Sequence, residues 1–446
     1  MQQGRLSSPY IPNTDHDRLA MLQAIGVGSI EELFSDIPSG YGHPSIDLPF
    51  PLSELELRNE LQALANLNST VGNVPSFLGG GAYHHFIPAV VNHVVSRGEM
   101  ATAYTPYQPE VSQGTLQATY EFQSIVSHLM GMEVANAGMY DGATALAEAA
   151  LMACRVTGRG RIGLLDTLSP AYQEVIRTYT EPQGLEVFLT GQEAPSVKED
   201  TACLVVQHPN SYGYLENISG LEMVAHDNGA LLVVSTDAVF LGMFKPPGDY
   251  GADIAVAEGQ PLGVPLSYGG PYIGLFTSKA EFLRQMPGRI VGKTVDTHGR
   301  DGYVLTLQTR EQHIRRERAT SNICTSEALV GTAVVAYVAC MGKVGMRHIA
   351  ELTYHKSHYA ASLISEIAGY SIPIGGTFFQ EFVVECPVAP AEVNRSLLSQ
   401  GIIGGLDVSD RVENGLLICV TEMNPREEID ALVEALTRIG NGTAKQ

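Results

Sequence analysis

The stretch from Leu231 to Gly274 constrains the fold of this chain more than any other. It begins with the apolar, β-branched run Leu231–Ser235, which is typical of a strand buried in a parallel sheet. Asp237 follows this run, at the strand end where open α/β sheets bind their ligands. A second short strand, Asp253–Ala257, leads into Glu258-Gly259-Gln260. The stretch therefore predicts a ligand-binding edge with an acid after one strand and an amide after the next.

Strand and helix patterns alternate over a longer region around this stretch, from Arg161 to Leu275. The alternation predicts a doubly wound, mostly parallel sheet. We expect three parts: an N-terminal helical segment (1–75), a large domain (76–330) and a smaller C-terminal α/β domain (331–446). The expected strands of the large domain are Ile162–Leu165, Leu185–Leu189, Ala202–Val206, Leu231–Ser235, Ile254–Ala257 and Ile273–Phe276.

This layout resembles that of pyridoxal-phosphate (PLP) transferases of the aspartate aminotransferase type, known as fold type I. In that fold an Asp at the first strand end pairs with the pyridinium nitrogen, and a Lys just past the second strand forms the Schiff base with PLP. Asp237 is present here, but Gln260 stands at the lysine position, and an amide cannot form an imine. The resemblance therefore implies a subunit that has lost its own cofactor chemistry. The chain has seven lysines, none of them at that position: Lys198, Lys245, Lys279, Lys293, Lys343, Lys356 and Lys445.

Composition narrows the possible partners and the compartment. The net charge of −21 argues against nucleic acid and membrane surfaces as partners. Hydrophobic residues make up 44% and charged residues 17%, which fits a large core and indicates that a partner covers part of the surface. The six cysteines are scattered singly, without a C-x-x-C pair or zinc spacing. Since we find no signal-peptide pattern and no long apolar span at the N-terminus, we expect a soluble, cytoplasmic protein.

Two segments that precede the predicted strands in the sequence are candidates for lining a substrate site. In the first, residues 77–91, three consecutive glycines let the backbone approach a ligand, and His84 and His85 follow. The local sequence offers no further metal ligands, so we predict hydrogen-bonded histidines and no metal site. The second segment holds Tyr104 and Tyr107 in an extended loop bounded by prolines. We predict that these phenols border a substrate pocket, while packing alone is the simpler explanation of their presence.

Two turns fit phosphate binding. Gly142-Ala143-Thr144 begins an Ala-rich helix, and in fold type I enzymes this turn holds the PLP phosphate on backbone N–H groups. Asp141 just before it would repel a phosphate, so we interpret the turn as a former phosphate site with Asp141 as the helix N-cap. Thr320-Ser321-Asn322 is expected to open a long helix that runs through Met341. In dimers of this fold the matching turn reaches the neighbour's phosphate, so these three residues are candidates for binding a partner's PLP phosphate.

Several longer segments resemble one family. The segment YIPNTDHDRLAMLQAIGVGSIEELFSDIP is similar to the opening of the first subunit of the split bacterial glycine dehydrogenase (decarboxylating), the P-protein of the glycine cleavage system. The similarity continues in FLGGGAYHHFIP, YTPYQPEVSQGTLQ, GADIAVAEGQPLG, YGGPYIG and RRERATSNICTSEAL, and so covers nearly the whole chain. The resemblance implies an α2β2 heterotetramer whose second subunit, a homologue, carries the PLP-lysine. It also implies that the complex decarboxylates glycine and passes the aminomethyl group to the lipoyl arm of the H-protein, with PLP bound by the partner and not covalently by this chain.

The residues alone leave two other functions open. One is a catalytically inactive PLP-fold paralogue that acts as a structural or regulatory scaffold. The other is an independent enzyme that uses Lys293 for its Schiff base. Lys293 also lies in Gly292-Lys293-Thr294, which resembles the end of an ATP-binding P-loop, but Pro287 stands where that motif needs a glycine. We therefore do not expect ATP binding.

Overall fold

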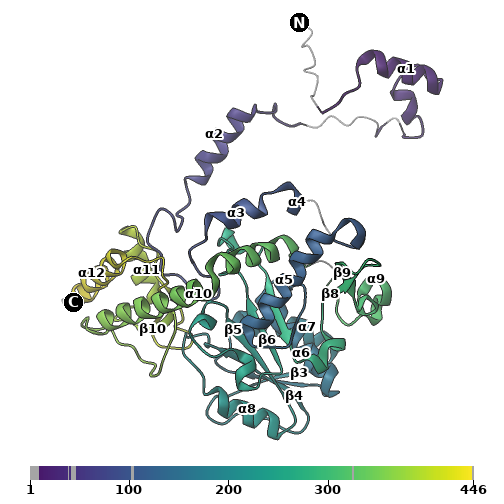
Figure 1. The fold of residues 1–446 in the computed structure, drawn as a ribbon. Helices are drawn as coiled ribbons and strands as arrows, with labels where there is room; N and C mark the ends of the chain where they lie inside the picture. The colour runs from purple at the N-terminus through teal and green to yellow at the C-terminus, as the bar shows by residue number, and fades with distance from the viewer. Residues whose placement is uncertain (1–9, 39, 42–46, 102–104, 324–325, 444–446) are drawn as a thin grey trace. The chain divides into compact units, whose positions relative to one another are not determined.

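The computed structural model describes residues 10–38, 40–41, 47–101, 105–323 and 326–443, and the chain divides into two compact units, residues 1–69 and 70–446 (Figure 1). The first unit contains α1 (Asp15–Ile25), the short turn η1 (Glu31–Phe34) and α2 (Glu54–Ala65). α1 begins at a capping box formed by Thr14 and Asp17, and it ends at Gly26 in the left-handed conformation (φ 89°). Ser53 and Glu56 form the same box at α2. All three elements lie within residues 1–75, where the sequence predicts a helical segment.

A seven-stranded sheet forms the centre of the second unit. Its strand order is β1-β7-β6-β5-β4-β2-β3. The five strands from β6 to β3 run parallel, whereas β7 is antiparallel to β6 and β1 to β7. The strands are β1 (Val134–Ala135), β2 (Arg161–Leu165), β3 (Glu186–Thr190), β4 (Thr201–His208), β5 (Leu231–Asp237), β6 (Ile254–Glu258) and β7 (Gly274–Ser278). The doubly wound, mostly parallel sheet is confirmed, and the six expected strands are present with end shifts of at most two residues.

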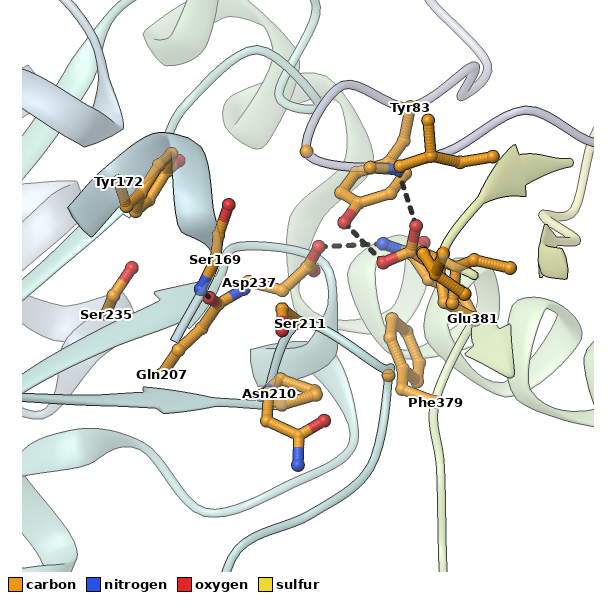
Figure 2. Close-up of a pocket in the computed structure, with 18 of the residues that line it drawn as sticks. Tyr83, Ser169, Tyr172, Gln207, Asn210, Ser211, Ser235, Asp237, Phe379 and Glu381 are labelled. Atoms are coloured by element: carbon orange, nitrogen blue, oxygen red, sulfur yellow. Dashed lines mark hydrogen bonds between the residues drawn. The ribbon is translucent and has the colours of Figure 1, made fainter. Parts of the chain in front are cut away.

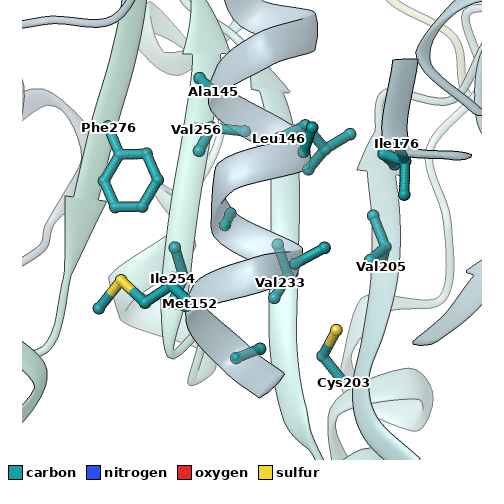
Figure 3. Packing of buried hydrophobic residues seen from close by; sticks show 14 of the residues in the cluster. Ala145, Leu146, Met152, Ile176, Cys203, Val205, Val233, Ile254, Val256 and Phe276 are labelled. Carbon is teal, nitrogen blue, oxygen red and sulfur yellow. The ribbon is translucent and has the colours of Figure 1, made fainter. Parts of the chain in front are cut away.

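Helices cover both faces of this sheet, and successive strand residues alternate between them. On one face Val233 and Val256 pack with Leu146 and Met152 of α6 (Gly142–Thr157), as Figure 3 shows. On the other face Val234 packs against α8 (Ile218–Asp227), and residues of β6 and β7 pack against α5 (Gln113–Met130). A further helix, α7 (Pro170–Thr180), lies beside α6. Because neither face meets water, the strands consist of continuous apolar runs.

The longest helix, α10 (Ala328–Ser365), is broken at Gly342 (φ 58°, ψ −179°). The sequence predicts a helix that opens at Thr320 and runs through Met341. The structure starts it at Ala328, and the break at Gly342, directly after Met341, separates it from the helical part that continues to Ser365. By length and composition α10 is apolar enough to cross a membrane. Its Tyr337 is nevertheless fully buried in the cluster that contains Phe122 of α5, as in the core helix of a globular unit.

A smaller antiparallel sheet, in the order β10-β12-β11, lies in the C-terminal part of the second unit. Its elements are β10 (Glu381–Glu385), α11 (Pro390–Ser399), β11 (Leu406–Asp407), β12 (Gly415–Cys419) and α12 (Arg426–Thr443). A hairpin of β8 (Ile290–Val295) and β9 (Asp301–Thr306) was not predicted. Gly292-Lys293-Thr294 belongs to strand β8 and therefore does not form a phosphate-binding loop. The remaining short helices include α3 (Ala89–Val95), α4 (Gly98–Ala101) and α9 (Gln312–Arg315).

Candidate functional site

A cavity of about 230 Å³ lies at the carboxyl ends of β4, β5 and β6 (Figure 2). Its walls also include the glycine-rich loop at residues 80–83 and two segments of the small sheet, 379–381 and 406–411. Pro209 and Asn210, which follow β4, line it as well. This is the edge at which doubly wound sheets bind ligands, and it is the position that the sequence predicts for Asp237.

Asp237 ends β5 and points into this cavity. Its Oδ1 accepts hydrogen bonds from the amides of Val239 and Phe240 at 2.8 Å each. Its Oδ2 accepts one from Gln380 Nε2 at 2.9 Å. Burial raises the pKa of Asp237 by more than these hydrogen bonds and His85 lower it. The carboxyl thus connects the end of β5 to the small sheet.

Gln260 stands at the expected lysine position and is 2% exposed. Its Oε1 accepts from the Tyr83 amide at 2.9 Å, and its Nε2 donates to the carbonyls of Tyr83 (3.0 Å) and Val264 (2.8 Å). All of these partners are backbone groups, so the side chain anchors the glycine-rich loop. The lining of the cavity contains Glu258 and Pro261 on either side of Gln260, but not Gln260 itself.

Glu258 places its carboxyl at the start of α6, the predicted former phosphate turn. Its Oε2 accepts from the Gly142 amide at 2.9 Å, where a helix N-terminus favours negative charge. Burial raises the pKa of Glu258 to about 7. A Cβ at Gly142 would lie 2.7 Å from Tyr172 Oη, so only glycine fits this contact. Asp141 caps α6 as predicted, because its Oδ1 accepts from the Thr144 amide at 2.8 Å.

These residues do not fit PLP in this chain's own cavity. The amide of Gly142 that would bind a phosphate already donates to Glu258. Asp141 adds a second carboxyl at the same helix start. At the lysine position, Gln260 offers no amine. The cavity therefore lies at the sheet edge where the fold binds its cofactor, but it offers neither a free phosphate-binding turn nor a lysine.

A further buried acid, Glu381, holds the glycine-rich loop over the cavity. It is 5% exposed, and its two oxygens accept from the Gly80 amide (2.6 Å) and Tyr83 Oη (2.8 Å). Burial raises the pKa of Glu381 to about 7. Next to it, His85 Nδ1 pairs with Glu422 Oε2 at 2.7 Å. Burial lowers the pKa of His85, but the Glu422 carboxylate outweighs this effect, so the pKa is raised overall.

Tyr107 lies away from this cavity. Its hydroxyl accepts from Arg289 Nη2 at 3.1 Å, and its ring lies edge-on to His313. Arg289 is 5% exposed and pairs with Glu311. Tyr107 itself remains 47% exposed. The structure therefore gives Tyr107 a fixed orientation at the surface, whereas Tyr104 lies outside the described residues.

Thr320-Ser321-Asn322 lines a separate surface cavity together with Arg155 and Arg316. The expectation that these residues open a helix is wrong, because α10 begins at Ala328. Ser321 Oγ donates to Glu148 Oε1 at 2.6 Å and accepts from the Ile323 amide at 3.1 Å. Such local bonds from a serine hydroxyl to the backbone compete with helix formation.

Comparison with known proteins shows which family this chain belongs to. The family model described as "Glycine cleavage system P-protein" matches residues 8–436. The chain belongs to the glycine cleavage system P-protein family. It is 49% identical over 443 residues to the "Probable glycine dehydrogenase (decarboxylating) subunit 1" of Thermomicrobium roseum, covering 96% of this chain and 98% of that one.

Solved structures agree with this membership in the P-protein family. The crystal structure of a glycine decarboxylase (P-protein) of the glycine cleavage system, in inhibitor-bound form, is 43% identical, with a TM-score of 0.92. The match covers 97% of this chain and 100% of that one. Glutamate decarboxylase from Lactobacillus brevis shares the fold at 14% identity and a TM-score of 0.65, covering 90% of this chain and 96% of that one. The predicted resemblance and the fold type I class are thus confirmed, and family and fold together support the use of PLP.

Sequence reasoning missed three features of the P-protein cavity. Glu258 was placed at a strand end but was not expected to bond to α6. Glu381 begins β10 of the small sheet and Gln380 directly precedes it, and the sequence carries no motif there. Arg411, which also lines the cavity, is more than a hundred residues further along the chain than the strands that form the cavity's base.

Proposed function

We propose that this chain is the subunit of an α2β2 glycine dehydrogenase that works with a second, PLP-bearing homologous subunit. The complex decarboxylates glycine and transfers the aminomethyl group to the lipoyl arm of the H-protein, in the cytoplasm. PLP supplies the electron sink for the decarboxylation when it is bound to the partner's lysine. The observation that carries the proposal is Gln260, whose buried amide makes three backbone hydrogen bonds at the lysine position.

The start of α6 also supports the proposal that the partner subunit, and not this chain, binds PLP. In fold type I enzymes this turn holds the phosphate, whereas here Glu258 accepts the hydrogen bond of Gly142. A phosphate dianion at this place would meet the carboxyls of Glu258 and Asp141. Like charges in a buried site raise the free energy of both groups. Loss of the lysine and loss of the phosphate site are two independent changes, and both favour a partner that holds the cofactor.

We infer that Thr320-Ser321-Asn322 contributes to the partner's site by binding the PLP phosphate. The support is the pair of guanidinium groups, Arg155 and Arg316, that line the same surface cavity, which also contains Glu148 and Glu317. Among the described residues, Arg155 Nε is buried and makes no hydrogen bond. A guanidinium N–H of this kind suits a phosphate oxygen, and charge-assisted bonds to phosphate are strong.

We further infer that Tyr104 and Tyr107 border the glycine and lipoyl pocket at the subunit interface. Tyr107 is supported by its exposure of 47% and by the buried Arg289 that fixes its hydroxyl. A half-exposed phenol that is held by a buried cation loses little freedom when a ligand or partner covers it.

The exchange of the glycine carboxyl carbon with bicarbonate tests the proposed function. We would measure it with this chain alone, with the second subunit alone, and with both, each in the presence of the H-protein. The proposal predicts exchange only in the mixture. Equal exchange by the second subunit alone would reduce this chain to a scaffold, and exchange by this chain alone would make it an independent enzyme.

A further inference from the structure

Five acidic residues line the cavity at the ends of β5 and β6, and two of them, Asp407 and Asp410, are exposed. The other three, Asp237, Glu258 and Glu381, are buried or partly buried. Together they accept eight hydrogen bonds, all of them from backbone amides, the Gln380 amide or the Tyr83 hydroxyl. Figure 2 shows Asp237 and Glu381 pointing toward one another from opposite walls. An ionised carboxylate has about four acceptor sites, so all three groups keep capacity for a further donor.

Within the described part of the chain, the positive groups near these three carboxyls lie beyond ion-pair distance: His85 acts on Asp237 at longer range, and Arg411 lines the same cavity. None of the three carboxyls forms an ion pair with Lys, Arg or His there, although other buried acids do, such as Glu311 with Arg289 and Glu422 with His85. Buried charges in proteins are normally paired. The three carboxyls therefore border a cavity without a directly paired cation.

A neutral acceptor in the same wall points to the same kind of ligand. Gln380 is 4% exposed and lines the cavity. Its Nε2 donates to Asp237, while its Oε1 makes no hydrogen bond within 3.5 Å among the described residues and has the His85 side chain as its neighbouring donor. An amide oxygen has two acceptor sites, and His85 can fill only one of them. A ligand that donates a hydrogen bond beside Asp237 would fill the other.

We propose that the cavity is a binding site for a small compound with a primary ammonium group, held by Asp237, Glu381 and Gln380 Oε1. An ammonium group has three N–H donors and one positive charge, which matches two carboxyls and one carbonyl oxygen. At about 30 Å³ per water molecule, the cavity of about 230 Å³ has room for about eight water molecules, so it suits a small compound of up to a similar number of non-hydrogen atoms. The inference concerns this chain alone and stands whether or not the complex catalyses the proposed reaction.

Proton release accompanies such binding. Burial raises the pKa of both Glu258 and Glu381 to about 7, so near neutral pH each group carries a proton part of the time. A cation bound beside them favours the ionised form and expels this proton. A neutral or anionic ligand would not have this effect.

Two sources could supply the ammonium group, a simple amine or an amino acid. Arg411 lines the cavity and donates to Ser211 Oγ at 2.9 Å. A guanidinium in the same cavity suits the carboxylate of an amino acid. Comparing methylammonium with glycine separates these sources, because only glycine carries both charges.

Calorimetric titration of the full chain tests the site, in two pH 7 buffers that differ in ionisation enthalpy. The probes are methylammonium, glycine, potassium and acetate. We expect saturable binding of methylammonium with release of protons, and no binding of acetate. Glu381→Gln should weaken methylammonium binding about tenfold, the loss of about 1.4 kcal/mol that a charge-assisted contact provides. Glu385→Gln, at the exposed end of the same strand, is the matched control and should bind as the parent does.

The result is decisive in either direction. Tighter binding of glycine than of methylammonium would identify an amino-acid site with Arg411 as the carboxylate partner, and equal binding would identify an amine site. Absence of saturable methylammonium binding at millimolar concentrations would overturn the proposal. Displacement by equimolar potassium would overturn it too, since any monovalent cation would then suffice. If Glu381→Gln does not fold, Asp237→Asn provides the same test at the opposite wall.

Discussion

Replacing Gln260 with leucine removes the hydrogen bonds that join the lost lysine position to the glycine-rich loop. The side chain is 2% exposed, so water does not reach the groups that the substitution leaves behind. The change keeps a side chain of similar size. It leaves the Tyr83 amide, the Tyr83 carbonyl and the Val264 carbonyl without their present partners.

The expected loss follows from the number of these bonds. A protein hydrogen bond contributes about 1 kcal/mol net, and a buried group without a partner costs about 1–3 kcal/mol. Three bonds are lost, and two of them belong to Tyr83, whose hydroxyl also supports Glu381. We therefore expect Gln260→Leu to lower the free energy of unfolding by about 3 kcal/mol.

Urea denaturation of the full chain, followed by circular dichroism, measures this loss. Gln117→Leu is the matched control, because Gln117 is exposed on α5 and makes one side-chain bond, to Glu121. It should change the free energy of unfolding by less than about 0.5 kcal/mol. If Gln260→Leu costs less than about 1 kcal/mol, the amide is not the anchor described here.

Three further predictions concern other residues. Burial raises the pKa of Glu258 from 4.5 to about 7, so the folded chain keeps a proton that the unfolded chain releases, and stability falls as pH rises from 4.5 through 7. In urea titrations across this range, Glu258→Gln should flatten the decline, and an unchanged slope would contradict the assignment. Thr320→Val with Ser321→Ala should increase the release of PLP from the diluted complex while its mass stays unchanged, and retention equal to the parent would refute the phosphate role. Tyr104→Phe and Tyr107→Phe should each slow glycine–bicarbonate exchange by about 1 kcal/mol or more in the barrier if the hydroxyl bonds a buried polar group, whereas unchanged kinetics would leave both as packing residues.

The sequence predicts best those elements whose pattern of apolar residues follows directly from their burial. The strand Leu231–Asp237 is covered on both faces, and therefore its residues are apolar without interruption. The position of Asp237 at its end follows from the same run. Gln260 could be recognised as a substitution because the resemblance to PLP enzymes fixes where the lysine belongs.

The features that the sequence does not predict depend on contacts between distant residues. Glu258 bonds to Gly142 across 116 positions, and Glu381 bonds to Gly80 across 301. Neither pair leaves a local motif. The start of α10 was misplaced for a different reason: hydroxyl and amide residues such as Ser321 resemble a helix start, but the Ser321 hydroxyl bonds to Glu148 and to its own backbone segment instead.

The central claim is that the second subunit, and not this chain, binds PLP through a lysine. Borohydride reduction of the assembled complex tests this claim most directly when mass spectrometry of the peptides follows. The account predicts a pyridoxyl adduct on one lysine of the second subunit. It predicts none on the seven lysines of this chain, including Lys293, which pairs with Asp301 at 2.8 Å on the β8–β9 hairpin. A pyridoxyl adduct on any lysine of this chain would contradict it.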